Sequence, residues 1–139
     1  MPIYPTKEEI LAEPEVVFSD KILGTMNEFK KVWQQNKNMS DTDRFYIIYS
    51  LLRRLNRSFF GDNDIQVCYN PELTTASYNW LTHTIMLKDL SIISALHEFG
   101  HKIVGNDELG ACRFSVHLFR KTFPKAFEKL HWEGHQLKK

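Results

Sequence analysis

Two histidines four residues apart frame the segment with the clearest chemistry, "LHEFGHKIVGNDE" at residues 96–108. On a helix, His97 and His101 lie one above the other and can direct ring nitrogens at one metal ion, about 2.0–2.1 Å from each. Glu98 then lies about 100° around the axis, where it cannot bind that ion but can reach a water bound to it. The H-E-x-x-H pattern therefore predicts a zinc-activated water, with Glu98 as the general base.

A catalytic zinc usually takes three protein ligands and leaves the fourth position to water. The downstream chain offers five candidates for the third ligand: Asp107, Glu108, His117, His131 and His135. Asp107 is also suited to capping the next helix, and Glu108 to the first turn of that helix. His117 follows Glu108 by nine residues, so it faces the other way on the same helix and is expected at the surface or the core edge. His135 is expected to be a polar residue near a fraying terminus.

Peptide hydrolysis also needs a hydrogen-bond donor aimed at the negative charge that develops on the substrate oxygen. Tyr69, Tyr78, His83 and His131 are candidates for this task, and Tyr78 and His131 are retained as the predicted oxyanion-stabilising residues. Taken singly, each of the four fits a structural role better than a catalytic one.

Two helices are predicted before the motif. The first begins at Ser19 or Asp20, and the second spans about residues 39–60, with Ser40 and Asp43 resembling a capping box and Gly61 ending it. The apolar residues of each helix recur at helical spacing: Ile22, Met26, Phe29 and Trp33 in the first, and Phe45, Ile48, Leu52, Leu55 and Phe59 in the second. Residues 1–18, with three prolines, are expected to form an irregular arm.

A small sheet is predicted between the second helix and the motif. Residues 64–70, 74–79 and 82–88 alternate or are rich in β formers, which indicates three short antiparallel strands with Asn79 and Trp80 in a turn. The last of them, "THTIMLK", is expected to be the edge strand that pairs with an extended substrate. Asp89 would cap the motif helix, which runs to Gly105; a further helix would run from about Asn106 or Asp107 to Thr122, and a short one would start at Pro124.

Length and composition indicate one globular domain spanning residues 1–139. Eighteen Lys and Arg against seventeen Asp and Glu leave a net charge of +1, so DNA binding is possible through local basic segments but is not supported by the overall charge. The two cysteines, Cys68 and Cys112, form no close pair and are expected to be reduced thiols. No signal peptide or long apolar run is present, so we expect a cytoplasmic protein with no membrane association.

Residues 55–105, with "HTIMLK" followed by "HEFGH", resemble the core of zincin metallopeptidases of the SprT-like and minigluzincin kind. The resemblance implies an α+β, zincin-like fold with its core at residues 55–122. It also implies a catalytic Zn²⁺ held by His97 and His101, with Glu98 as base. Gluzincins supply a glutamate from the next helix in an E-x-x-A-x-x-F/A setting, which "ELGACRF" resembles and which makes Glu108 the expected third ligand. Metzincin-like spacing points instead to Asp107, and the downstream histidine of SprT-like proteins to His135.

Three functions follow from these observations as expectations. The first is zinc-dependent hydrolysis of peptide bonds in an extended polypeptide. The second is a non-catalytic zinc-binding domain on a zincin scaffold that acts in protein binding or assembly. The third is an SprT-like, DNA-associated protease, for which the basic segments "LLRRLNR" and "RKTFPK" are the supporting feature.

Overall fold

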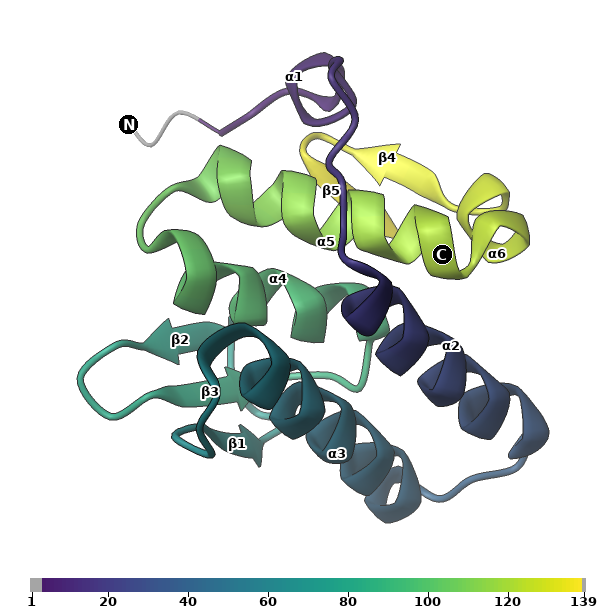
Figure 1. Ribbon diagram of the computed structural model, residues 1–139, viewed down its shortest axis with the longest axis vertical. Coiled ribbons are helices and arrows are strands. Elements are labelled where there is room, and N and C mark those ends of the chain that lie inside the picture. Colours follow the sequence, from purple (N-terminus) through teal and green to yellow (C-terminus); the bar gives the residue numbers. More distant parts are fainter. Residues whose placement is uncertain (1–3, 139) are drawn as a thin grey trace.

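The computed structural model describes residues 4–138 as a mixed α+β fold of six helices, a three-stranded sheet and a two-stranded hairpin (Figure 1). The elements in chain order are α1 (Lys7–Ile10), α2 (Asp20–Gln35), α3 (Asp41–Phe60), β1 (Gln66–Tyr69), β2 (Ser77–Asn79), β3 (Thr84–Leu87), α4 (Ile92–Val104), α5 (Glu108–Thr122), α6 (Pro124–Glu128), β4 (His131–Glu133) and β5 (Gln136–Lys138). The α+β class and the two leading helices are confirmed. Within residues 4–138, none of the helices combines the length and apolar character needed to cross a lipid bilayer.

Side-chain caps set the starts of α2 and α3. The hydroxyl of Ser19 accepts a hydrogen bond from the backbone N–H of Ile22, and that of Ser40 accepts one from Asp43. These bonds satisfy N–H groups that the first helical turn would otherwise leave unpaired. At the other end of α3, Gly61 adopts φ 75°, a left-handed conformation that favours glycine and stops the helix. Both predicted starts and the predicted stop are confirmed.

The sheet differs from the antiparallel one expected. Its strand order is β1-β3-β2, with β1 parallel and β2 antiparallel to β3. Residues 70–76 carry the chain past the position of β3 before β2 begins, so the β2–β3 hairpin inserts β3 beside β1. The expectation that the segment "THTIMLK" is an edge strand is therefore wrong. β3 is central, with Ile85 and Leu87 fully buried, and β2 forms the edge.

Helix α4 lies between the sheet and α5, against which it packs closely (Figure 1). Its N-cap is Ser91 rather than the predicted Asp89, whose carboxylate accepts the backbone N–H of Ser91 instead. Gly100 faces Ala111 across the two helices, where a Cβ on residue 100 would lie 3.1 Å from the Cα of Ala111. The absence of a side chain on Gly100 therefore lets the two helix backbones approach closely.

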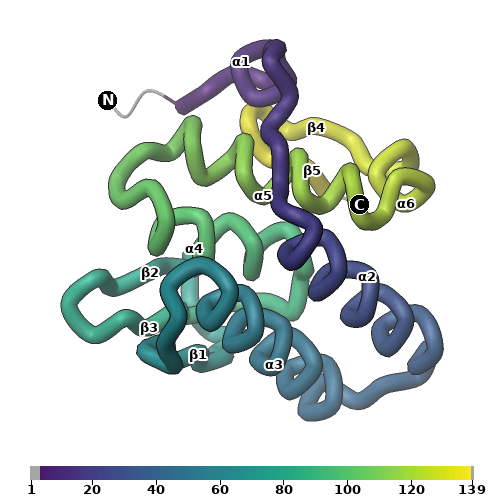
Figure 2. Tube along the Cα trace, in the orientation of Figure 1, coloured from purple at the N-terminus to yellow at the C-terminus, as the bar shows by residue number. Residues whose placement is uncertain are grey.

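The N-terminal segment forms an ordered strap across α5 rather than a wholly irregular arm (Figures 1 and 2). It contains the capped helix α1, and the guanidinium of Arg113 donates hydrogen bonds to four of its carbonyls: those of Glu9, Ile10, Ala12 and Pro14. His117 completes the attachment: its Nδ1 accepts the N–H of Val16, and its Nε2–H donates to the carbonyl of Ile10. At 1% exposure, His117 is a core residue, which corrects the expected surface or core-edge position.

The C-terminal hairpin β4–β5 was not predicted from the sequence. Gly134, with φ 62°, and His135 form its two-residue turn, so His135 lies in a paired hairpin rather than near a fraying terminus as expected. Trp132 on β4 packs against a small second core of Ile10, Cys112 and Val116. The hairpin and the strap are thus held to the same helix, α5.

Candidate metal centre

The motif helix and the first turn of α5 bring three predicted ligands together. Nε2 of His97 lies 2.6 Å from Oε1 of Glu108, and Nε2 of His101 lies 3.4 Å from Oε2 of the same carboxylate. Gly105, with φ 69°, ends α4, and Asp107 caps α5, so the chain turns back within three residues and Glu108 becomes the first residue of α5. The short connection after His101 is therefore sufficient to place Glu108 between both histidines.

His101 is held in a defined ring orientation. Its Nδ1–H donates to the carbonyl of Gly105 at 2.7 Å, because a carbonyl oxygen can only accept. In the neutral ring, Nε2 then carries the free lone pair, and this is the atom that faces Glu108. Such support of the second ring nitrogen by a carbonyl is typical of histidines that bind metals.

Cys112 joins the cluster, and the sequence analysis did not identify it. Its Sγ lies 3.8 Å from Nδ1 of His97 and 3.5 Å from Oε1 of Glu108. Among the residues described, His97, Glu108 and Cys112 each offer a ligand atom within 4.8 Å of the others. Burial, reinforced by Glu108, raises the pKa of the Cys112 thiol to about 12. The signal available in the sequence was the spacing of four from Glu108, which places both residues on one face of α5.

The donor set suits zinc. Two imidazoles and one carboxylate form a known catalytic combination, and ligand bonds of about 2.0–2.2 Å in tetrahedral geometry hold neighbouring donor atoms roughly 3.3 Å apart. The separation of 3.4 Å between His101 and Glu108 meets this requirement. The distance of 2.6 Å between Nε2 of His97 and Oε1 of Glu108 is shorter than this, so the pair must separate for an ion to enter.

Glu98 is buried beside this cluster, as the motif requires of a base. It is 7% exposed, and burial raises the pKa of its carboxyl group to about 7. Glu98 and His101 line the same pocket of about 410 Å³, with Tyr78, Trp80, Gly105 and Asn106 as the other lining residues. The pocket thus joins the end of the edge strand β2 to the motif helix.

The alternative third ligands lie in other environments. The Asp107 carboxylate accepts the N–H of Gly110 as the cap of α5, and the ring of His135 stacks on Tyr4 with centroids 4.3 Å apart. Among residues 4–138, neither belongs to the cluster of His97, Glu108 and Cys112, which does not include His101 either, and no contact of Asp107 or His135 with a motif histidine joins those of Glu108. Glu108 is therefore the candidate that contacts both motif histidines.

The candidates for stabilising the oxyanion also lie in different parts of the structure. Tyr78 lines the pocket with Glu98, whereas Tyr69 lines a different cavity beside α3. His131 lies on β4, where its side chain is 56% exposed and its Nε2 is 3.8 Å from Oε1 of Glu133. Tyr78 is thus the candidate that the structure places near the base.

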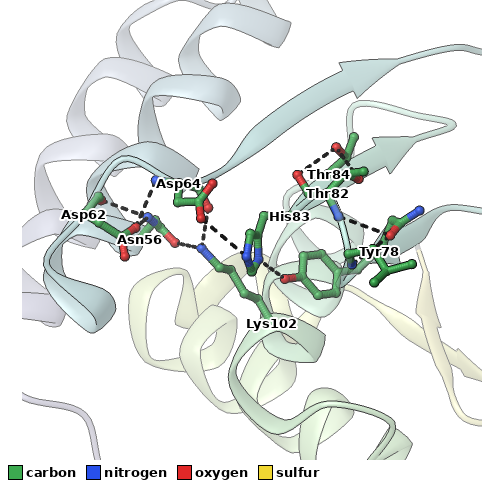
Figure 3. A network of polar contacts seen from close by, with 10 residues as sticks. Asn56, Asp62, Asp64, Tyr78, Thr82, His83, Thr84 and Lys102 are labelled. Carbon is green, nitrogen blue, oxygen red and sulfur yellow. Dashed lines mark hydrogen bonds and ion pairs between the residues drawn. The ribbon is translucent and has the colours of Figure 1, made fainter.

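A network of polar contacts includes the Tyr78 hydroxyl (Figure 3). The Tyr78 hydroxyl lies 2.9 Å from Nδ1 of His83, and Nε2 of His83 lies 3.4 Å from Oδ2 of Asp64. Lys102, one turn after Glu98 on α4, contacts Asn56 and donates to the backbone carbonyl of Asp64 at 2.7 Å. The network therefore ties the β2–β3 hairpin to α4 and to the end of α3.

The three arginines of the segment "LLRRLNR" are engaged within the molecule. Arg53 donates to the hydroxyl of Tyr49, Arg54 pairs with Glu28, and Arg57 donates to Asn63. These contacts on α3 favour a structural role for the segment "LLRRLNR".

No family model, curated protein or solved structure matches this chain. The proposed function therefore rests on the geometry of the site.

Proposed function

We propose that this chain is a zinc-dependent peptidase, with His97, His101 and Glu108 as zinc ligands and Glu98 as general base. The observation that carries the proposal is the contact of the Glu108 carboxylate with both motif histidines, at 2.6 Å and 3.4 Å. A chance H-E-x-x-H on a structural helix does not require a third ligand at this point. The zincin-like scaffold belongs to the same proposal, and the antiparallel edge strand β2 beside α4 supports it.

In the proposed hydrolysis, the residues of the pocket have different roles. Zinc would polarise the substrate carbonyl and acidify a bound water. The buried carboxylate of Glu98 accepts the water proton and returns it to the leaving amine. The hydroxyl of Tyr78, at the pocket wall, is the group suited to hydrogen-bond the substrate oxygen as it gains charge.

The free edge of β2 provides a place for the substrate. An extended peptide can add to an exposed sheet edge through main-chain hydrogen bonds, which orient it without fixing its sequence. β2 is paired with β3 on one side, and its residue Tyr78 lines the pocket that contains Glu98. A peptide paired with β2, rather than with the central strand β3, would therefore pass the base.

A second function has one specific observation in its favour. Cys112 lies beside His97 and Glu108, so a zinc ion could take four protein ligands and have no position for water. Such a site would be structural and would suit a binding domain on the same scaffold. The buried Glu98 argues for the peptidase, because a closed zinc site has no use for a neighbouring base.

Zinc content and proteolysis, measured on the same samples, test the proposal. We expect one zinc per chain in the wild type, together with digestion of casein. Glu108→Ala should lower zinc affinity more than about 100-fold, since changes outside the first ligand shell alone cost 10–100-fold. Asp107→Asn is the matched control, because it removes the adjacent negative charge but keeps a side chain that can cap α5. Zinc binding that survives Glu108→Ala, or is lost equally in Asp107→Asn, would contradict the ligand assignment.

A further inference from the structure

The turn between β2 and β3 presents two large apolar side chains to solvent. Trp80 and Leu81 are neighbours, and each is 71% exposed. Exposed apolar side chains of this size, grouped together, often mark a binding surface. Of the two, Trp80 lines the pocket that contains Glu98 and His101. It also follows directly on Asn79, the last residue of the edge strand β2.

Hydrogen bonds hold this turn in one conformation. The side-chain oxygen of Asn79 accepts the backbone N–H of Leu81 at 2.9 Å and that of Thr82 at 3.3 Å. The hydroxyls of Thr82 and Thr84 lie 2.9 Å apart, and His83, which adopts φ 52°, is bonded through its ring to Tyr78 (Figure 3). The indole of Trp80 is thus presented from an anchored turn, so its ordering on binding costs little conformational entropy.

The character of the pocket favours an apolar ligand group. Outside the motif residues Glu98 and His101, the lining residues are Tyr78, Trp80, Gly105 and Asn106, none of which carries a charge. A charged side chain would find no countercharge there beyond the groups already assigned to catalysis. An aromatic or large aliphatic side chain would instead cover the exposed face of the indole and remove apolar surface from water.

We infer that Trp80 forms the subsite that selects a large apolar or aromatic side chain of the peptide substrate next to the bond that is cleaved. This inference rests on the proposed peptidase function and specifies its substrate class. A peptide paired with the edge of β2 reaches Trp80 as it leaves the strand, beside the pocket of Glu98. Trp80 is therefore a specificity-determining residue, distinct from the groups that bind zinc or move protons.

The test compares four zinc-loaded proteins: the wild type, Trp80→Ala, Trp80→Phe and Leu81→Ala. Cleavage sites in a mixture of peptides from denatured proteins, read by mass spectrometry, give the preferred residues. The ratio of kcat/KM is then measured for two synthetic peptides that differ only in Phe or Ala at the preferred position. We expect Trp80→Ala to lower this ratio about tenfold or more, the discrimination typical of apolar pockets. Trp80→Phe should restore much of the preference.

Leu81→Ala is the control, because it removes an equally exposed apolar side chain that does not line the pocket. It should keep the wild-type ratio. If the wild type cleaves without an apolar preference, or if Trp80→Ala and Leu81→Ala behave alike, the subsite is wrong while the peptidase stands. If none of the four proteins cleaves any peptide although zinc is bound, the proposed function and the subsite both fail.

Discussion

Each group at the candidate centre owes its chemistry to its immediate surroundings. Burial favours a proton on Glu98, whose pKa is raised to about 7, whereas burial lowers the pKa of His97 and so favours the neutral ring that can bind a metal. A cation held by the histidines would in turn favour the ionised form of Glu98. In the proposed function, the same few residues would therefore serve both the binding of an ion and the activation of a base.

The role of Cys112 decides between an open and a closed zinc site. In the proposed open site the ligands are His97, His101 and Glu108, and Cys112, whose thiol pKa burial raises to about 12, packs against Ile10 and Val116. Cys112→Ala should therefore keep one zinc per chain and retain casein digestion. The cobalt-substituted wild type should lack a thiolate-to-cobalt charge-transfer band.

The exposed Cys68 provides the control for this prediction, since Cys68→Ala removes a thiol that lies outside the cluster. Loss of zinc in Cys112→Ala alone, or a charge-transfer band that disappears with it, would favour the binding domain with four protein ligands.

At the scale of residues, helical spacing predicted that His97, Glu98 and His101 are neighbours, and the resemblance to gluzincins singled out Glu108 among the five candidates for the third ligand. The sequence did not reveal Cys112, because its place beside His97 depends on how α4 and α5 pack against each other and not on a motif. It also misplaced His117, because its partners are backbone groups more than one hundred residues away, which no local pattern encodes.

At the scale of elements, the centre depends on the close approach of α4 and α5. The ideal Cβ of an alanine at position 100 would lie 3.1 Å from the Cα of Ala111 and 3.3 Å from its carbonyl oxygen, and backbone atoms cannot move aside cheaply. We predict that Gly100→Ala lowers the free energy of unfolding by about 1–3 kcal/mol, as overpacked cores do. It should also weaken zinc binding, because it displaces α5 and with it Glu108.

Gly24→Ala is the matched control, since the same change in α2 meets no atom within 4 Å. It should leave zinc affinity unchanged and raise the free energy of unfolding by up to about 1 kcal/mol, the difference in helix propensity. Urea unfolding and competitive zinc titration measure both quantities. Equal effects of the two substitutions would show that helix approach does not control the site.

Most helices were predictable because their caps and apolar spacing are local features. The starts at Ser19 and Ser40 and the ends at Gly61 and Gly105 all follow from single residues. Strand order was not predictable in this way, since alternation identifies a strand but not its neighbours. The hairpin β4–β5 was missed because each strand has only three residues and its segment lacks the run of β formers that indicated the equally short β2.

At the scale of the whole molecule, α5 connects the centre to both ends of the chain. One part of its surface carries Glu108 and Cys112, and its later turns hold the N-terminal strap through Arg113 and His117. Cys112 contacts Ile10 of α1 in the second core while it lies beside Glu108. The strap therefore stabilises the helix that supplies the third ligand.

His117 makes this attachment sensitive to pH. Burial lowers the pKa of His117, so below about pH 6.5 the unfolded chain takes up a proton that the folded protein still excludes. The contribution of His117 to the free energy of unfolding is therefore present above about pH 6.5 and is lost as the pH falls below that value. His117→Gln, whose amide can accept and donate but does not titrate, should show a smaller loss of unfolding free energy between pH 7 and pH 5. An equal loss in urea titrations of both proteins would contradict this.

In the proposed function, a zinc held by His97, His101 and Glu108 works with Glu98 to hydrolyse peptides. The most direct measurement compares the wild type with Glu98→Gln, with zinc content and casein digestion determined on the same samples. Both proteins should bind one zinc per chain, and Glu98→Gln should digest about 10²–10⁴-fold more slowly, the usual contribution of a general base. A wild type that binds zinc stoichiometrically but does not digest, or a variant that digests equally well, would contradict the claim.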